Sequence, residues 1–311
     1  MTSDFQTALE AGDLAALRAC PKADLHVHAI MGGNREFIRE RTGHDIAPLD
    51  GVLGSMDEMH SWVGERAGDL FQGAAGRAIA FEATFVQAQR DGVSRIEMGE
   101  DVWGITLHDG SAQSVWDMLL DAQARGGPQV EWIPQMGLSR HCPFKALEWW
   151  MAPMLELGTF KTLDLSGDEF AQPIEVFEPL YRRAKAAGLT LKAHVGEWGT
   201  ADDVWRAVEL LELDEVQHGI AAVDSPQVMR MLANSGVRLH VCPTSNLKLG
   251  RVARMEDHPI RRLYDAGVKV TVNTDDVLMF GSSLSEEFLA LHQAGVMTAA
   301  ELDAVRLEGL R

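Results

Sequence analysis

Two histidines one residue apart, His26 and His28, stand at the end of an apolar segment in KADLHVHAIMGGN, residues 22–34. Alternate residues of a β-strand project from the same face, so a strand here would place the two imidazoles side by side. Two neutral imidazoles on one face supply half of the ligands of a zinc site. A single histidine at a strand end more often bonds to a backbone carbonyl, so the pair needs further ligands before it predicts a metal.

Further groups that could complete a metal site follow other apolar segments. They are His194 and Glu197 in LTLKAHVGE, His218 in EVQHGIA, and Asp275 and Asp276 in VKVTVNTDD. With the first two histidines, His194 and Asp275 make a set of three imidazoles and one carboxylate, which leaves one position for water, as a catalytic zinc site requires. A metal of this kind lowers the pKa of its water toward neutrality. The candidates to move the proton and activate the electrophile are Glu197, His218 and Asp275.

The elements that would position these groups are strand-like segments that alternate with longer segments of helical spacing. The strand-like segments are residues 22–28, 94–101, 130–140, 161–169, 189–197, 215–221, 237–246 and 268–276. This alternation predicts a parallel sheet with crossover helices, and eight units in 311 residues favour a closed (β/α)8 TIM barrel. Chemistry in such a barrel takes place at the carboxyl ends of the strands, where the polar groups occur.

The remaining features of the sequence fit one barrel domain over residues 1–311. An open, doubly wound sheet would need a glycine-rich phosphate loop after the first strand, and neither G-x-G-x-x-G nor G-x-x-x-x-G-K-[ST] occurs. Residues 29–92 are long enough to hold extra helices over the barrel mouth. Helical spacing is clearest over 173–188 and 225–236, each of which ends at a glycine.

Composition narrows the class of partner and the compartment. The formal charge of −18 argues against nucleic-acid binding through a broad basic surface, although it permits a small-molecule site. Three cysteines without a C-x-x-C pair predict no disulfide framework and suit a reducing compartment. Residues 1–20 lack the continuous apolar core of a signal peptide, and no segment has the length of a membrane span. The sequence therefore predicts a cytoplasmic protein without a nucleic-acid or membrane partner.

Six motifs together resemble a known family. They are DLHVH at 24–28, LDLSGDE at 163–169, KAHVGE at 192–197, QHGI at 217–220, CPTSN at 242–246 and NTDD at 273–276. The series is similar to the signature of the adenosine deaminase-like branch of the metal-dependent amidohydrolase superfamily, in the family's order and over most of the chain. The resemblance implies a zinc-dependent hydrolase that uses water to replace the amino group of an adenine-like ring by a carbonyl and releases ammonia.

The resemblance also implies a role for each candidate residue. One Zn²⁺ per chain, or another divalent transition metal, would be held by His26, His28, His194 and Asp275. Glu197 would be protonated and donate to the ring nitrogen beside the attacked carbon, which is plausible because an apolar site raises a carboxyl pKa. His218 would orient the hydroxide and help its deprotonation. Asp276 would bind the imidazole-ring nitrogen of a purine, and the Gly167 backbone N–H would meet a pyrimidine-ring nitrogen.

The segment after the first two histidines departs from the family pattern. The family usually reads Leu, an acid, then Gly-Ser, and its acid contacts the ribose 5′-hydroxyl; here Ile30 takes that position. Val277 replaces the proline that commonly follows the aspartate pair. We expect Ile30 and Met31 to form an apolar wall, with Asn34 or Arg35 as candidates for a substitute contact to a sugar hydroxyl. The substrate expected is adenine, adenosine or a modified adenine nucleoside.

Two alternative functions stay open at the level of sequence. The first is a metal hydrolase of the wider superfamily that acts on another aminated heterocycle, a cyclic amide or an ester. Such an enzyme has no need of a neutral Glu197 or of the purine-binding Asp276. The second is a non-catalytic binding protein derived from a deaminase, which would be expected to have lost a metal ligand or Glu197, and neither is missing.

Overall fold

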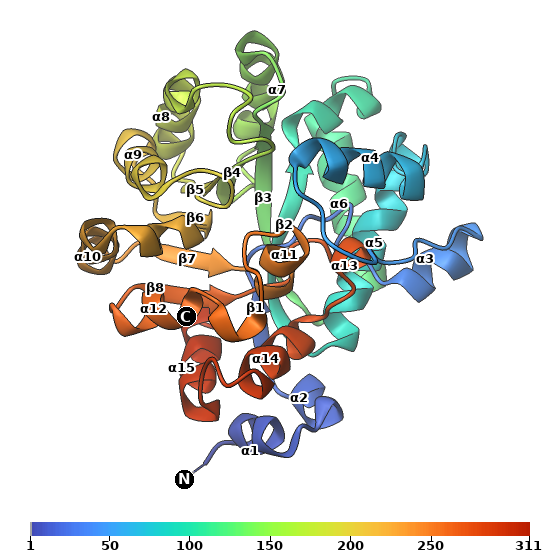
Figure 1. Ribbon diagram of the computed structural model, residues 1–311. Coiled ribbons are helices and arrows are strands. Elements are labelled where there is room, and N and C mark those ends of the chain that lie inside the picture. The colour runs from blue at the N-terminus through green and yellow to red at the C-terminus, as the bar shows by residue number, and fades with distance from the viewer. Residues whose placement is uncertain (1) are drawn as a thin grey trace.

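Eight parallel strands form one sheet in which each strand pairs with the next along the chain (Figure 1). The computed structural model describes residues 2–311. The strands are β1 (Lys22–Asp24), β2 (Val93–Asp101), β3 (Glu131–Ser139), β4 (Thr162–Ser166), β5 (Thr190–Val195), β6 (Glu215–His218), β7 (Arg238–Val241) and β8 (Lys269–Val272). All eight expected strands are present, and the expected (β/α)8 TIM barrel is confirmed.

The barrel closes between its last and first strands through a short contact. Val27 forms an isolated parallel bridge with Asp275. Around it, the backbone N–H of His28 donates to the carbonyl of Asp275 over 3.1 Å, and that of Asp275 donates to the carbonyl of His26 over 2.9 Å. The bridge therefore ties the first two histidines of the sequence directly to the carboxylate expected beside them.

The expected first strand, 22–28, is too long. The strand ends at Asp24, because side chains replace the ladder bonds that would continue it: Leu25 donates its N–H to Asn273 Oδ1 over 2.9 Å, and Thr274 donates its N–H to Asp24 Oδ1. His26 and His28 consequently lie in an extended segment beyond the strand.

Helices surround the strands, and their apolar faces explain why. They are α5 (Ala74–Arg90), α6 (Ala112–Gly126), α7 (Phe144–Leu157), α8 (Glu178–Ala186), α9 (Ala201–Leu211), α10 (Pro226–Ser235), α12 (Ile260–Asp265) and α15 (Ala299–Gly309) (Figure 1). In α9, for example, Val204, Ala207, Val208 and Leu211 recur at the spacing of one helix face and are buried. Thr200 caps that helix in a capping box with Asp203.

The long interval between β1 and β2 contains α3 (Arg35–Thr42) and α4 (Met56–Ala67) as well as α5, as expected. Short helices α11 (Pro243–Lys248) and α13 (Val277–Phe280) lie at the same end of the barrel (Figure 1). A second apolar core joins these segments to the barrel; its members include Met31, Ile38, Leu49, Trp62, Phe71, Leu278 and Phe280. This core holds a helical cover over the carboxyl ends of the strands.

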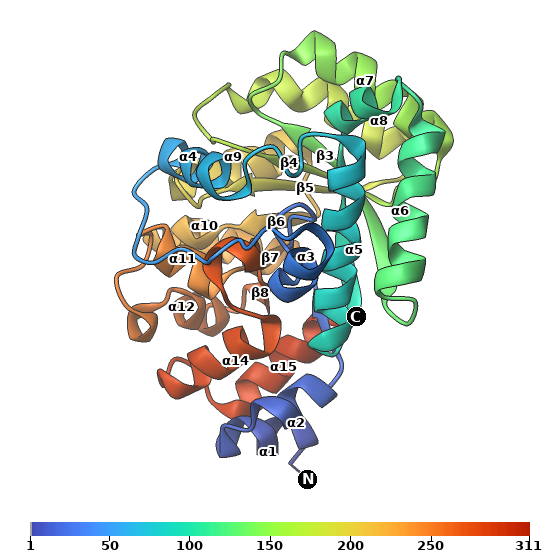
Figure 2. The same cartoon turned by 90° about the vertical axis from the view of Figure 1, so that its right-hand side faces the viewer.

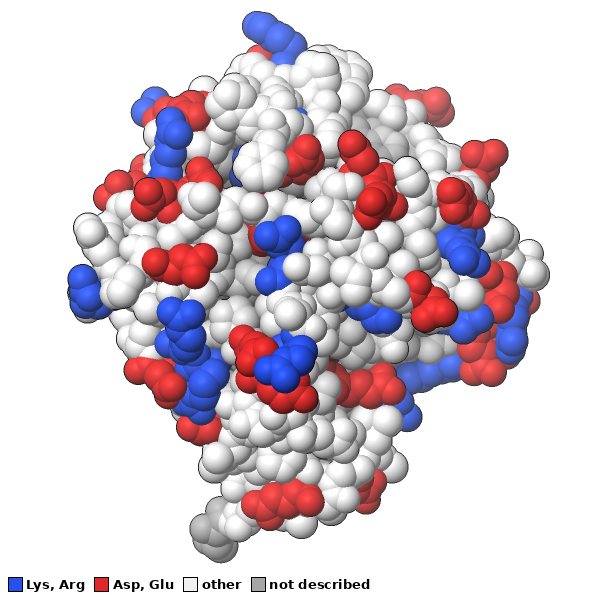
Figure 3. Space-filling view, viewed as in Figure 1, with Lys and Arg blue, Asp and Glu red and all other residues white. Residues whose placement is uncertain are grey.

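The remaining helices form one group with α15, which packs against β8 and β1. They are α1 (Asp4–Ala11) and α14 (Leu284–Gln293), which contact α15, and α2 (Leu14–Ala19), which contacts α1 and α14 (Figure 2). Short 3₁₀ helices are η1 (Val102–His108), η2 (Ile174–Phe177), η3 (Ile220–Asp224) and η4 (Met255–Asp257). Within residues 2–311, no helix combines the length and apolarity needed to cross a membrane. On the face in Figure 3, basic side chains occur in small groups beside acidic ones.

A buried lysine supports the barrel interior beneath the site. The Lys192 ammonium lies 2.6 Å from Glu97 Oε2 and 2.9 Å from Glu215 Oε2, and donates to the carbonyl of Leu25 over 3.2 Å. Lys192 and Glu97 are almost inaccessible to solvent. The lysine thus forms ion pairs with two carboxylates, the second of which also pairs with Arg238, and it holds the backbone just before His26.

Replacing Lys192 with Met is expected to lower the free energy of unfolding by about 3 to 5 kcal/mol, because it leaves the buried Glu97 carboxylate without its counter-ion. Urea denaturation of the metal-free protein measures this effect without a contribution from metal binding. Lys185→Met is the control, since it removes an exposed pair with Glu212 and should change stability little. Equal effects of the two substitutions would contradict the importance of the buried cluster.

Candidate active site

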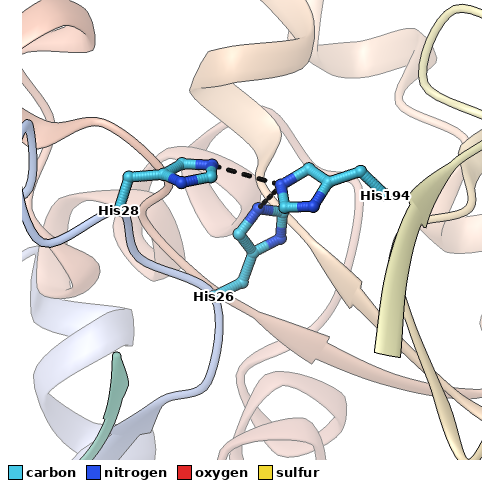
Figure 4. A group of neighbouring side chains, drawn as sticks. All are labelled: His26, His28 and His194. Carbon is cyan, nitrogen blue, oxygen red and sulfur yellow. Dashed lines mark hydrogen bonds between the residues drawn. The ribbon is translucent and has the colours of Figure 1, made fainter. Parts of the chain in front are cut away.

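Three imidazole nitrogens from two segments converge at the carboxyl end of the barrel (Figure 4). His194 Nε2 lies 3.0 Å from His26 Nε2 and 3.1 Å from His28 Nε2. Asp275 Oδ1 lies 3.6 Å from His26 Nε2 and 3.3 Å from His28 Nε2. Donor atoms around one zinc ion at ordinary bond lengths lie about 3 to 4 Å apart. The three imidazole nitrogens, with Asp275 Oδ1 beside two of them, could therefore hold one metal ion.

The outer nitrogens of two rings show which way the inner lone pairs point. His26 Nδ1 lies 3.1 Å from the carbonyl of His240, and His194 Nδ1 lies 3.1 Å from Asp164 Oδ2. Both partners accept hydrogen bonds, so each ring carries its proton on Nδ1 and directs a lone pair from Nε2 toward the other ring. Two lone pairs that face each other at 3.0 Å repel unless a cation lies between them. The arrangement therefore supports a metal position.

The charges around the three rings also favour a cation. Burial lowers the pKa of His26 well below its usual value and keeps that ring neutral. Burial acts in the same direction on His28, but the charge of Asp276 and a hydrogen bond with Asp275 outweigh it and raise the pKa of His28 to about 10. Without a metal, the surrounding carboxylates thus hold a proton on His28, and a bound metal would take its place.

Two of the candidate residues have unusual backbone conformations. His218 ends β6 with φ of 62°, and Asp275 follows β8 with φ of 64°. Non-glycine residues rarely adopt this left-handed region, and such strain is typical of functional sites. Ser245 fixes the Asp275 side chain by donating to its Oδ2 over 2.7 Å. The backbone turns at these two residues bring their side chains toward the three histidines.

Glu197 lies in a loop that another carboxylate holds in place. Glu169 accepts hydrogen bonds from three consecutive backbone N–H groups, those of Gly196, Glu197 and Trp198, over 2.8 to 2.9 Å. The Glu197 side chain is buried, and its Oε1 lies 3.6 Å from His218 Nε2. Burial, with the charges of Asp275 and Glu169, raises the pKa of Glu197 well above its usual value. The site is built to keep this carboxyl protonated.

His218 and Asp276 are buried beside the three histidines and have shifted pKa values. Burial lowers the pKa of His218 to about 3, so its imidazole is neutral at physiological pH. Its Nε2 lies 3.8 Å from Asp275 Oδ2. Burial, together with the charge of Asp275, raises the pKa of Asp276 to about 7. Within residues 2–311, neither Asp276 Oδ1 nor Glu197 Oε1 has a hydrogen-bond partner.

A pocket of 370 Å³ opens over these groups. Its lining includes His28, His194, Glu197, His218, Asp275, Asp276 and Gly167, so seven of the eight candidate site residues border one cavity and His26 lies buried below it. Ile30 and Met31 line the pocket with Met59 and Val63 of α4 and Leu249. One side of the pocket is therefore apolar where the family pattern has an acid.

The expected substitute contact from Asn34 or Arg35 is wrong. Asn34 caps α3 by accepting the backbone N–H of Phe37, and Arg35 pairs with Asp45 over 2.7 Å. Both line a separate cavity of 460 Å³ that contains none of the candidate site residues. The turn formed by residues 29–33 directs them away from the active-site pocket.

Sequence reasoning missed two residues that orient the site, Asp164 and Glu169. Both occur in the motif LDLSGDE, so the signal was present. Asp164 faces the pocket from β4, and its contact with His194 depends on the neighbouring strand β5. Glu169 acts on the backbone of a loop 27 to 29 residues away. Neither contact is visible in the spacing of the residues along one segment.

Comparison with known proteins agrees with this geometry. The sequence pattern of the adenosine deaminase family matches residues 77–311. A putative adenosine/adenine deaminase of Treponema pallidum is 34% identical over 288 residues, which cover 93% of this chain and 96% of that protein. An adenine deaminase of Cupriavidus necator is 29% identical over 305 residues, covering 92% and 85% of the two chains.

Solved structures share the fold. Adenine deaminase from Arthrobacter aurescens superposes with a TM-score of 0.77 at 24% identity, over 94% of this chain and 93% of that chain. An amidohydrolase from Burkholderia ambifaria, determined with bound Zn, gives a TM-score of 0.76 at 23% identity, over 96% and 87% of the two chains.

The family match and the full-length relative support the same assignment. The matched region contains Glu197, His218 and both aspartates, and the relative extends over nearly the whole chain. The chain therefore belongs to the adenosine deaminase family and is a hydrolase of cyclic amidine C–N bonds that deaminates adenine-like substrates.

Proposed function

We propose that the chain is a zinc-dependent hydrolytic deaminase of adenine or an adenine nucleoside, with one metal ion held by His26, His28, His194 and Asp275. The observation that carries the metal proposal is the convergence of three imidazole nitrogens and a carboxylate oxygen, with the Nε2 lone pairs of His26 and His194 face to face. Zinc in the similar amidohydrolase of Burkholderia ambifaria supports the choice of metal.

The metal would supply Lewis-acid activation of water near neutral pH. The chain itself orients the ligands: the carbonyl of His240 fixes the ring of His26, Asp164 fixes that of His194, and Ser245 fixes the carboxylate of Asp275. Such outer contacts set the tautomer of each ring and hold the ligands ready. The neutral Nε2 of His218, 3.8 Å from Asp275 Oδ2, accepts a proton from the attacking water.

Glu197 provides the acid. Burial and the neighbouring carboxylates raise its pKa and favour the protonated form, which donates its proton to the ring nitrogen beside the carbon that carries the amino group. That carbon becomes more electrophilic, the oxygen of water adds to it, and the C–N bond to the amino group breaks. The proton that His218 accepted passes to the amino group, which leaves as ammonia. The added hydroxyl returns its proton to Glu197, and the ring carbon becomes a carbonyl. A lactonase or simple amidase has no use for this donor, so the buried neutral Glu197 favours deamination.

Two further residues orient the purine. The pKa of Asp276 is raised to about 7, so its carboxyl can carry a proton on Oδ1, which has no hydrogen-bond partner within residues 2–311. From there it can donate to the imidazole-ring nitrogen of the purine. The Gly167 backbone N–H meets a pyrimidine-ring nitrogen; φ of 93° at this residue requires glycine. Both border the same pocket as Glu197.

An ammonia-release assay on the zinc-loaded protein tests the proposal. Adenine, adenosine, AMP, cytosine and a pterin are compared, and the product is identified by its ultraviolet spectrum. Release of ammonia with conversion of adenine to hypoxanthine, or of adenosine to inosine, is expected. Turnover confined to a non-purine ring or to a cyclic amide or ester would overturn the proposed substrate class.

A further inference from the structure

We propose that Asp101 and Gln135 form a second recognition site within the active-site pocket, which binds hydroxyl groups on a sugar-like substituent of the aminopurine ring. The inference deepens the proposed function and rests on it. It assigns hydroxyl recognition to the end of β2 and the middle of β3, since position 30 holds an isoleucine that cannot accept a hydrogen bond.

The two residues face the pocket because of strand register. Asp101 ends β2 opposite Gly137 of β3, and Gly99 lies opposite Gln135. Alternate residues of a strand share a face, so these four residues all border the cavity. Gly137 leaves room for the carboxylate: a Cβ atom there would lie 2.1 Å from Asp101 Oδ1. The small residues thus allow one acid and one amide to form a polar wall.

Both residues have hydrogen-bonding capacity to spare. Trp103 donates its indole N–H to Asp101 Oδ2 over 3.0 Å, which fixes the carboxylate and leaves Oδ1 available for another donor. Gln135 Oε1 is buried and has no hydrogen-bond partner within residues 2–311. Leaving a buried acceptor unpaired is costly, so a ligand hydroxyl that donates to it stabilises the complex.

The charged residues around this subsite favour an uncharged substituent on the purine ring. The nearby guanidinium of Arg77 donates from Nε and Nη2 to Glu100 and stacks over the ring of Trp103 at 4.5 Å. The local cation is therefore already neutralised, and Asp101 adds a negative charge. A phosphate on the substituent would be repelled, whereas hydroxyl groups would be bound.

Apolar side chains in the same pocket lining complete the selection. Ile30, Met31, Met59 and Val63 offer apolar contact and no fixed charge. A substituent that carries both hydroxyl groups and exposed carbon atoms, such as an unphosphorylated ribosyl group, matches this mixed polar and apolar lining. The structure thus favours adenine nucleosides over nucleotides.

Kinetics with matched substrates test the site. Asp101→Ala and, separately, Gln135→Met are expected to lower kcat/KM for adenosine about tenfold or more while changing that for adenine less than about twofold, since only adenosine carries the hydroxyls. AMP should be a poorer substrate than adenosine for the parent enzyme. Asp117→Asn, an exposed acid on α6, is the control and should change neither value.

Binding of the reaction products gives a readout that does not depend on turnover. By calorimetry, Asp101→Ala should weaken inosine binding about tenfold and leave hypoxanthine binding unchanged. Equal losses for adenine and adenosine, no loss in either variant, or AMP turnover equal to that of adenosine would overturn the proposed subsite. Failure of the parent enzyme to deaminate any aminopurine would instead overturn the proposed function.

Discussion

Replacing Glu197 with Gln is expected to lower kcat by about 10² to 10⁴-fold and to leave the zinc content unchanged. The amide keeps the shape of the side chain but cannot deliver a proton to the ring nitrogen. Residue 197 lies outside the cluster of three imidazoles, so the proposed metal ligands keep their positions in the variant. Ammonia release under saturating adenine measures the first effect, and elemental analysis after gel filtration measures the second.

Measuring the stability of the Glu197→Gln variant distinguishes a catalytic role of Glu197 from a structural one. The pKa of Glu197 is raised above its unfolded value, so the stability it contributes is present below about pH 4.5 and is lost as the pH rises toward the raised value. Above that window, burying the ionised carboxylate opposes folding. In the metal-free protein at pH 8, Glu197→Gln should therefore unfold at a urea concentration at least as high as the parent.

Glu209→Gln is the matched control, since it makes the same chemical change at an exposed position of α9. It should retain full turnover. A Glu197→Gln enzyme as active as the parent would rule out proton donation by this residue. A variant that lost activity, zinc and stability together would show that Glu197 holds the fold rather than the reacting ring.

The sequence allowed prediction of the barrel and of most of the candidate site because both depend on local periodicity. Eight apolar segments that end in polar residues predict where strands end, and a parallel barrel brings those ends together whatever the helices between them do. His194 and Asp275, 81 residues apart, were therefore predictable as neighbours of His26, and the structure places their donor atoms within 3.6 Å of it.

What the sequence could not provide depends on side chains that bond across elements. The end of β1 at Asp24 is set by Asn273, and the tautomer of His194 by Asp164, each on another segment. The orientation of Asn34 could not be predicted from local spacing either. The turn at residues 29–33 is held by a hydrogen bond from the backbone N–H of Leu278 to the carbonyl of Met31. Such contacts depend on how segments far apart in the sequence are placed next to one another in the fold.

Replacing His194 with Ala is expected to abolish metal retention. His194 Nε2 lies 3.0 and 3.1 Å from the other two imidazole nitrogens, so its loss leaves two histidines and one carboxylate around a widened site. We expect about one zinc per chain in the parent and close to none in the variant after dialysis against a weak chelator, with deaminase activity lost in parallel. Elemental analysis by mass spectrometry gives the zinc content directly.

Asp164→Asn should distinguish loss of a ligand from loss of its orientation. The amide holds the His194 ring less firmly and weakens its basicity, so zinc affinity should fall about 10 to 100-fold while stoichiometric binding remains at high zinc. His44→Ala removes an exposed histidine far from the cluster and should change nothing. Zinc retained by His194→Ala at the parent's level would exclude this histidine from the metal site. Loss in Asp164→Asn as complete as in His194→Ala would mean that the ring cannot reach the metal unless Asp164 holds it.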